Sequence, residues 1–280
     1  MKFIESVRGG NLWPLGEGGN MVLGDQFIGG KTLRHWQELY APEGAEMAAN
    51  AWVAPVDWEK IKGGGTLVTE EGDVLGAVGD GASVIASGRS RLIMYPWDLL
   101  FANEQVVENM DASLCDGEVS EAANVEGVLV VGEGTRVLPG VFVEGNVVIG
   151  KNCKVGPNCY IRGNTAIGDD CHIGQGVEVK NSLIGHRVCV GHLSYVGDSV
   201  LGNDVNLGAG TVISNYRHDG ASHHSMVAGE LLDTGRVKFG AILGDGVHTG
   251  INTSIYPGRK LGSGATTRPA ECVERDLLGE

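Results

Sequence analysis

Aliphatic residues recur at every sixth position over much of the chain. The series runs from Val125 to Val179, resumes after a five-residue step at Ile184 and after another at Leu201, and returns in a third tract from Leu243. A small or β-branched residue stands four positions after most of these, and glycine often follows them directly. This period predicts short parallel strands joined by tight turns, three to a triangular coil of about eighteen residues.

The pattern indicates a mainly β protein, a left-handed parallel β-helix of hexapeptide repeats with a small α/β domain at its amino-terminal end. All 5 tryptophans precede the repeats, and the composition changes near residues 111–124. We therefore expect an amino-terminal domain over 1–118 and the β-helix over 119–280. Within the first domain, residues 65–79 predict a β-hairpin, and a helix is expected from about 95 to 110 with Pro96 in its first turn.

Glycine and cysteine have specific expected places in the coils. The chain has 46 glycines, and we expect those that follow the aliphatic positions to relieve crowded corners of the coils. Cys153 and Cys171 are one coil apart at inward positions, so they are predicted to stack inside the prism. We expect no disulfide framework and no metal cluster from the cysteine spacing.

The formal net charge of −14 argues against a general nucleic-acid-binding surface, because such a surface needs cations to replace phosphate counterions. The start of the sequence lacks the apolar stretch of a signal peptide, and no run approaches the ~20 apolar residues of a membrane span. We expect a cytoplasmic protein without a nucleic-acid or membrane partner, in which any cationic cluster is local.

A series of polar residues within the repeats is more specific than the repeat itself. It runs from Ile161-Arg162 through Val177-Glu-Val-Lys180 and Gly191-His-Leu-Ser-Tyr-Val-Gly-Asp198 to Asn206 and Asn215-Tyr216. Its spacing resembles the acetyltransferase part of the bifunctional N-acetylglucosamine-1-phosphate uridyltransferase/glucosamine-1-phosphate acetyltransferase family. The insertion that starts after Asn215-Tyr216 and ends before Lys238 resembles the archaeal type of that family.

The resemblance implies transfer of an acetyl group from acetyl-CoA to the amine of an amino-sugar 1-phosphate, glucosamine-1-phosphate above all. It implies His192 as the catalytic base, and histidine is the side chain that titrates closest to neutral pH. The positions it implies for the acceptor are Arg162, Glu178, Lys180, Tyr195, Asn206, Asn215, Tyr216 and Lys238. Those it implies for acetyl-CoA are Gly250, Ile251 and Arg275, with Ile251 contributing its backbone because a small polar residue is usual there. The family works as trimers, so a homotrimer is expected.

Arg162 and Lys180 are one predicted coil apart and therefore on the same face. A sugar phosphate carries about two negative charges, which an acidic protein repels unless cations are placed locally. Arginine offers a planar fork and lysine a point charge, so the two can clamp one phosphate. The alternative is a solvated ladder of surface charges.

Other interpretations stay open. The stretch Tyr95-Pro-Trp-Asp-Leu-Leu100 and the repeats after it also resemble sugar-phosphate nucleotidyltransferases, yet the glycine clusters at 8–11 and 16–19 do not match the phosphate loop of that family. A shortened head used for packing or regulation is favoured, and acetyl transfer is expected to survive its removal. A noncatalytic ligand-binding or scaffold protein of the same fold is a further alternative.

Metal binding is a separate alternative. Carbonic anhydrases of the γ type share the β-helix and bind zinc through histidines, but His172, His186 and His192 are not spaced by one coil. The histidines of the 215–238 insertion are expected to be solvated. We therefore predict no metal site.

Overall fold

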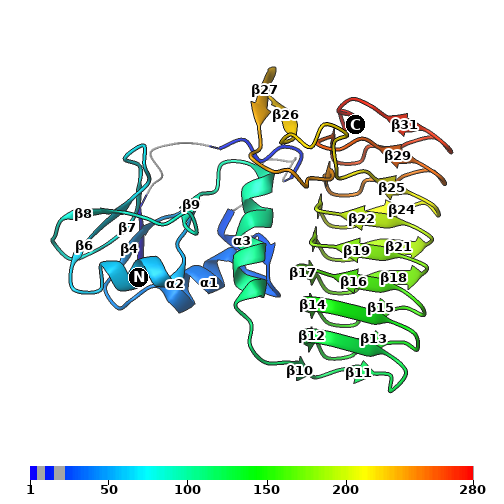
Figure 1. Ribbon diagram of the computed structural model, residues 1–280, viewed down its shortest axis with the longest axis horizontal. Coiled ribbons are helices and arrows are strands. Elements are labelled where there is room, and N and C mark those ends of the chain that lie inside the picture. Colours follow the sequence, from blue (N-terminus) through cyan, green and yellow to red (C-terminus); the bar gives the residue numbers. More distant parts are fainter. Residues whose placement is uncertain (5–9, 16–22, 280) are drawn as a thin grey trace.

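The computed structural model of the protein, which describes residues 1–4, 10–15 and 23–279, shows a parallel β-helix flanked on one side by a smaller α/β region (Figure 1). Arg8, Gly9 and the glycine cluster at 16–19 lie outside the described residues. The β-helix confirms the fold predicted from the six-residue period.

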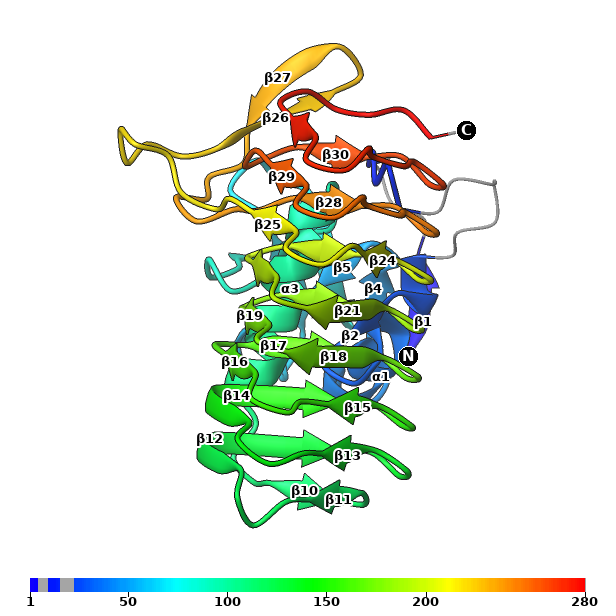
Figure 2. The same ribbon diagram turned by 90° about the vertical axis from the view of Figure 1, so that its right-hand side faces the viewer.

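The strands of consecutive coils pair in parallel and form three faces of a triangular prism, which we call faces A, B and C (Figure 2). Face A contains β10 (Leu114–Cys115), β17 (Thr165–Ile167), β20 (Leu183–Ile184), β23 (Val200–Leu201), β28 (Ile242–Leu243) and β30 (Lys260–Leu261). Face B contains β16 (Tyr160–Arg162), β19 (Glu178–Lys180), β22 (Tyr195–Gly197), β25 (Val212–Ile213), β29 (Ser254–Ile255) and β31 (Cys272–Val273). Face C contains β11 (Glu118–Val119), β13 (Arg136–Val137), β15 (Lys154–Val155), β18 (His172–Gln175), β21 (Cys189–His192) and β24 (Asn206–Leu207). The long strands β12 (Asn124–Val131) and β14 (Phe142–Ile149) run from face B onto face A.

The aliphatic positions of the repeat fill the prism. Val143, Ile161 and Val179 follow one another in register on face B, and each is fully buried. Burying a side chain of this size contributes about 1.5–3 kcal/mol. Cys153 and Cys171 stack as predicted, and the Cys171 amide donates a hydrogen bond of 3.4 Å to the Cys153 sulfur. The core therefore consists of small side chains in stacked layers.

We expected glycines such as Gly168, which follows Ile167, to relieve crowded corners, but Gly168 has a different role. Its φ lies outside the left-handed region, and a Cβ there would lie 2.6 Å from the Gly185 carbonyl oxygen of the next coil. This glycine thus allows two coils to approach closely. Left-handed corners are taken by other glycines, such as Gly163 (φ 68°), and by residues such as Asn181 (φ 46°) and Asp198 (φ 51°), whose short polar side chains tolerate that conformation.

The α/β region has its own sheet, in the order β1-β4-β7-β6-β8. These strands are β1 (Lys2–Ile4), β4 (Glu46–Ala48), β6 (Gly65–Val68), β7 (Val74–Val78) and β8 (Ser83–Ile85). The pairing of β6 with β7 confirms the predicted hairpin. The remaining elements are η1 (Leu23–Asp25), β2 (Phe27–Ile28), β3 (Lys31–Thr32), α1 (Leu33–Tyr40), β5 (Ala51–Trp52), α2 (Pro55–Lys60) and β9 (Arg91–Leu92).

Helix α3 (Pro96–Glu108) lies between this region and the β-helix and packs on face A (Figure 1). Its position confirms the predicted helix, with Pro96 in the first turn. Asn146 of β14 donates to the carbonyl oxygens of Val107 at 2.9 Å and Met110 at 3.2 Å, so the β-helix satisfies carbonyls that a helix end leaves without partners. No helix of the described segments has the length and apolar composition needed to cross a bilayer.

The predicted insertion leaves the prism at the corner between faces B and A. Leu183 of β20 pairs with Val200 of β23, which is 17 residues later in the sequence. Val200 pairs in turn with Ile242 of β28, which is 42 residues later, so the insertion lies between these two coils. The insertion carries a hairpin of β26 (His224–Val227) and β27 (Glu230–Asp233), which projects beyond the last coils (Figure 1). The returning chain buries Phe239 edge-on against Trp97 of α3, with the ring centres 6.0 Å apart.

Candidate active site

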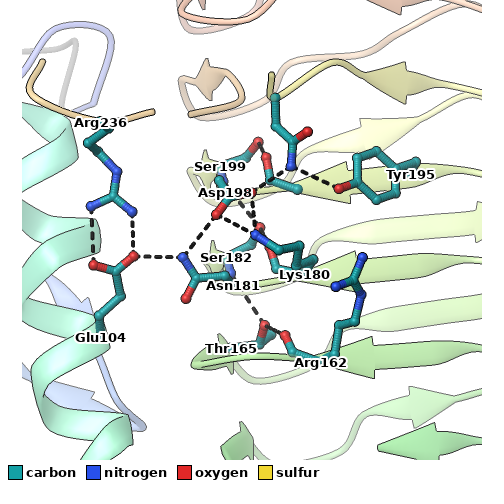
Figure 3. A network of polar contacts seen from close by, with 12 residues as sticks. Glu104, Arg162, Thr165, Lys180, Asn181, Ser182, Tyr195, Asp198, Ser199 and Arg236 are labelled. Carbon is teal, nitrogen blue, oxygen red and sulfur yellow. Dashed lines mark hydrogen bonds and ion pairs between the residues drawn. The ribbon is translucent and has the colours of Figure 1, made fainter. Parts of the chain in front are cut away.

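Face B carries four of the eight predicted acceptor-binding residues, namely Arg162, Glu178, Lys180 and Tyr195. The backbone of Arg162 on β16 pairs with that of Lys180 on β19, which confirms the spacing argument. Tyr195 on β22 pairs with Glu178, two residues before Lys180. Since alternate residues of a strand share a side and the intervening Val179 is buried, these side chains leave face B together. Figure 3 shows Arg162, Lys180 and Tyr195 on the three successive strands.

Each of the two cations already has a carboxylate partner in the chain. Glu178 Oε1 accepts from Arg162 Nε at 2.8 Å and lies 2.7 Å from Arg162 Nη2, and both side chains are about one-third exposed. Burial lowers the pKa of Arg162, but the hydrogen bond and charge of Glu178 outweigh that effect and raise it overall. An ion pair exposed to this degree contributes roughly 0–1 kcal/mol, so a dianion can displace the Glu178 carboxylate.

Lys180 is held much more firmly, by Asp198. Its Nζ donates to both Asp198 oxygens at 2.8 Å, and the carboxylate is only 2% exposed. Asp198 also accepts from Asn181 at 3.1 Å and from Asn215 at 2.6 Å. An ammonium group has three donors, so one N–H of Lys180 is left for a ligand. Asp198 was missed as a site residue, although it stands one coil length after Lys180 in the sequence.

Asn215 ties Tyr195 into the same network. Its Nδ2 donates to the Tyr195 hydroxyl oxygen at 2.9 Å. Burial raises the pKa of Tyr195, and the negative charges of Asp198 and Glu178 raise it further. The phenol therefore stays neutral near pH 7 and keeps a proton that it can donate to a phosphate or sugar oxygen.

Tyr216 and Lys238 form a pair at the two ends of the insertion. Their backbones make an antiparallel bridge, and Lys238 Nζ lies 3.6 Å from the centre of the Tyr216 ring. Tyr216, Arg217 and Tyr256 line a groove of about 490 Å³ next to them. The insertion thus adds an aromatic and cationic surface beside face B.

His192 and Asn206 lie on face C instead. His192 ends β21, is exposed, and is separated from Tyr195 by the corner at Leu193. Asn206 follows on β24, in register with Cys189. From His192 to Gly197, the residue opposite Lys180, the chain spans at most about 17 Å. The structure therefore places the imidazole at one edge of face B and the two cations at the other.

A second imidazole, that of His172, lies near His192 on face C. Burial lowers the pKa of His172, and the nearby charges of Lys154 and His192 lower it further. His172 is consequently neutral near pH 7.

The positions predicted for acetyl-CoA lie on later coils. The Gly250 amide donates to Thr267 Oγ1 at 2.9 Å, so it is already engaged within the chain. Ile251 is 54% exposed, and Arg275 is exposed close to the carboxyl-terminal end. Gly250 lies one coil beyond Gly208, two residues after Asn206, which puts Gly250 and Ile251 on the same side of the prism as face C. Arg275 instead follows β31 of face B, and Leu277 after it forms a bridge with Leu261 of face A.

His223 of the insertion is buried, whereas we expected the insertion histidines to be solvated. This residue is 2% exposed, its Nε2 donates to the Asn215 carbonyl oxygen at 3.2 Å, and burial lowers its pKa. It is therefore a packing residue behind Asn215 rather than a solvated side chain. In the parts of the chain that the structure describes, no three His, Cys, Asp or Glu side chains are grouped so that they could hold a metal ion.

Two residues outside the repeats complete the face B network (Figure 3). Glu104 of α3 accepts from Asn181 Nδ2 through Oε1 at 2.6 Å and from Arg236 Nη1 through Oε2 at 3.1 Å. Arg236 Nη2 also contacts Oε1. Neither was predicted as a site residue. They come from the amino-terminal region and from the insertion, where the repeat gives no positional information.

Comparisons with known proteins fit this geometry. A family model described as the GMPPB C-terminal domain matches residues 143–263, which include Arg162, Glu178, Lys180 and Tyr195. The chain is 40% identical over 182 residues to a bifunctional sugar-1-phosphate nucleotidylyltransferase/acetyltransferase of Sulfurisphaera tokodaii, covering 65% of this chain and 45% of that protein. It is 39% identical over 168 residues to the bifunctional protein GlmU of Methanococcus aeolicus, covering 60% of this chain and 40% of that protein. These matches confirm the predicted resemblance and its archaeal character.

The similarity has a limited extent. The chain spans less than half the length of these curated relatives. Among solved structures, a hexapeptide transferase family protein from Anaplasma phagocytophilum shares 18% identity with a TM-score of 0.22, over 53% of this chain and 71% of that one. That likeness is too low to add to the sequence relationship.

Proposed function

We propose that this protein is an acyltransferase that moves the acetyl group of acetyl-CoA to the amine of an amino-sugar 1-phosphate, with glucosamine-1-phosphate as the expected acceptor. The observation that carries the proposal is the pair of Arg162 and Lys180, in register on one face of a β-helix that is similar to bifunctional nucleotidylyltransferase/acetyltransferases. The product would serve the synthesis of sugar nucleotides.

The phosphate group would bind at the edge of face B near Lys180. Arg162 would exchange the Glu178 carboxylate for phosphate oxygens, because that ion pair is exposed and weak. Lys180 would use its remaining N–H while Asp198 holds the other two. The Tyr195 hydroxyl shares Asn215 with Asp198 and can donate a third hydrogen bond.

The amine would then lie toward the Leu193 corner, near His192. In the reaction the amine nitrogen attacks the thioester carbonyl carbon, the C–N bond forms, and the C–S bond breaks. His192 accepts the proton that the nitrogen loses, and the CoA thiolate leaves and is protonated. A positioned base of this kind typically contributes about 10²–10⁴ in rate, and backbone amides at the coil corners would stabilise the oxyanion.

Acetyl-CoA would approach along face C, where Gly250 and Ile251 follow His192 on later coils, and Arg275, which follows β31 of face B, would reach it from a neighbouring copy. A homotrimer would place a second copy against this side, so that its surface closes the groove over the thioester. The insertion residues Tyr216 and Lys238 would then contact the acceptor from the face B side.

An assay of the intact protein tests the proposal. Release of the CoA thiol is measured with acetyl-CoA and glucosamine-1-phosphate, galactosamine-1-phosphate or unphosphorylated glucosamine, and the N-acetylated product is identified by mass spectrometry. We expect thiol release and product with an amino-sugar 1-phosphate, and much less with the unphosphorylated sugar. Absence of product with every amino-sugar phosphate would overturn the proposal in favour of a noncatalytic binding protein.

A further inference from the structure

The amino-terminal region and the insertion meet at the corner between faces A and B through a largely buried ion pair. Glu104 of α3 and Arg236 of the insertion bond through both oxygens and both terminal nitrogens, and their side chains are only 18% and 16% exposed. Two parallel N–H···O bonds fix orientation as well as distance, and low exposure strengthens the attraction. This pair therefore holds two segments, 132 residues apart in sequence, in one arrangement.

Asn181 connects that pair to the candidate phosphate site. One side-chain amide donates to Glu104 at 2.6 Å and to Asp198 at 3.1 Å. Asn181 occupies a left-handed corner, so its backbone has little freedom to follow a moving partner. A continuous series of contacts thus runs from Arg236 through Glu104, Asn181 and Asp198 to the ammonium group of Lys180 (Figure 3).

We propose that Glu104 is a positioning residue, which couples the amino-terminal region and the insertion to Lys180 through Asn181 and Asp198 and so sets the affinity for the phosphate group of the acceptor. The inference rests on the proposed function. Asp198 determines where the Lys180 ammonium points, and Asn181 and Asn215 determine how the Asp198 carboxylate is turned. A displacement of about 1 Å in a positioned group can cost on the order of 10² in efficiency.

The inference changes the expected role of residues 1–118. From the sequence we expected acetyl transfer to survive their removal. Helix α3 instead buries Leu100 and Val107 against the outer surface of face A and supplies Glu104 to the network. The amino-terminal region is then part of what aligns the site, even though the groups assigned to substrate contact lie in the β-helix and the insertion.

Two substitutions in the full-length protein test the coupling. Glu104→Gln keeps the shape of the side chain but removes the charge that Arg236 and Asn181 share. Asn181→Gly keeps the left-handed corner accessible, leaves the Glu104–Arg236 pair intact and cuts its connection to Asp198. We expect each variant to raise KM for the amino-sugar 1-phosphate about tenfold, which corresponds to about 1.4 kcal/mol, with kcat and the KM for acetyl-CoA within twofold of the native protein.

The double variant and the unphosphorylated sugar separate positioning from a merely structural role. If Glu104 acts through Asn181, the double variant is no worse than either single variant, because coupled residues are non-additive. Activity with the unphosphorylated amino sugar should be the same in all variants. Glu108→Gln, an exposed position one turn along the same helix, is the matched control and should leave every parameter unchanged.

A measurement without substrate keeps the coupling distinct from the proposed function. Hydrogen exchange should accelerate in Glu104→Gln at the amides of His223 and Phe239, which bond to Arg236 and Asn215, and remain native in Glu108→Gln. Unchanged exchange at these amides would overturn the coupling, whatever the native protein acetylates. In an active native protein, an unchanged KM for the phosphorylated sugar, or an equal rise with the unphosphorylated one, would also overturn it.

Discussion

Arg162 stands directly opposite Lys180 on the neighbouring strand, and the two side chains leave the same face of the β-helix. Their anionic partners differ in burial: Glu178 is about one-third exposed, whereas Asp198 is almost fully buried. The two cations are therefore unequal. Arg162 can change partners at little cost, while Lys180 depends on a fixed carboxylate, because an unpaired buried charge costs several kcal/mol.

Replacing Arg162 by Ala should weaken binding of the acceptor with little loss of stability. A hydrogen bond to a charged group contributes about 1.5–3 kcal/mol, so we expect KM for the amino-sugar phosphate to rise by roughly tenfold to 100-fold. Steady-state kinetics with each substrate varied in turn measure this. Arg187→Ala is the control, because Arg187 makes an exposed two-bond pair with Asp204 outside the site. An equal rise in KM for acetyl-CoA would argue against a phosphate contact.

Replacing His192 by Ala should lower kcat by about 10²–10⁴, because a positioned base accounts for a factor of that size. Binding of the amino-sugar phosphate, measured by calorimetry, should change much less. His35→Ala serves as the control, since His35 is exposed on α1, outside the β-helix. Turnover that stays within twofold of the native rate would remove His192 from the mechanism.

Replacing Gly168 by Ala should destabilise the β-helix. The added methyl group would lie 2.6 Å from the Gly185 carbonyl oxygen, and overpacking of this kind costs about 1–3 kcal/mol. Gly63→Ala is the matched substitution, because nothing lies within 4 Å of a Cβ there, and it should change the free energy of unfolding by less than about 0.5 kcal/mol. Denaturant unfolding of both variants measures the difference. Equal stabilities would mean that the coils can separate without loss.

Lys260 should make stability depend on pH. Burial lowers its pKa to about 8, and its ammonium group donates to the Met226 carbonyl oxygen at 2.7 Å. An unfolded lysine keeps its proton to about pH 10.4, so between about pH 8 and 10.4 the unfolded chain binds more protons than the folded one. The free energy of unfolding therefore rises with pH across this window, by about 3 kcal/mol at most.

Lys260→Met isolates that contribution. Unfolding is followed at pH 7.5 and pH 9.5 for the native protein and the variant. The native protein should gain stability relative to the variant at the higher pH. A difference that is the same at both pH values would mean that Lys260 keeps its proton in the folded state.

The repeat predicted the positions of site residues within the coils but not those of residues outside them. A coil-length spacing was enough to place Arg162 beside Lys180, and the same reasoning applied to Asp198 would have placed it over Lys180. Two five-residue steps shorten the later coils, so that Gln175 pairs with His192 only 17 residues on. The period therefore predicted which residues face outward more reliably than which of them meet.

Glu104 and Arg236 could not have been found in this way. Glu104 lies on a helix whose docking depends on Asn146, Asn103 and the apolar outer surface of face A, and no period connects that helix to the coils. His223 was misjudged for a related reason. No sequence signal distinguishes a solvated histidine in a long insertion from one that is buried against the Asn215 carbonyl group.

The insertion has a consequence for how such a protein can be modified. Val200 and Leu201 pair with Ile242 and Leu243 as regularly as they pair with the preceding coil, so the extra chain leaves the rungs beneath and above it intact. Because each coil contacts only its neighbours, a different peptide can be inserted at this corner without changing the pairing of the coils. Exchanging the peptide there would replace the aromatic and cationic surface of Tyr216 and Lys238 beside face B, while the paired coils stay unchanged.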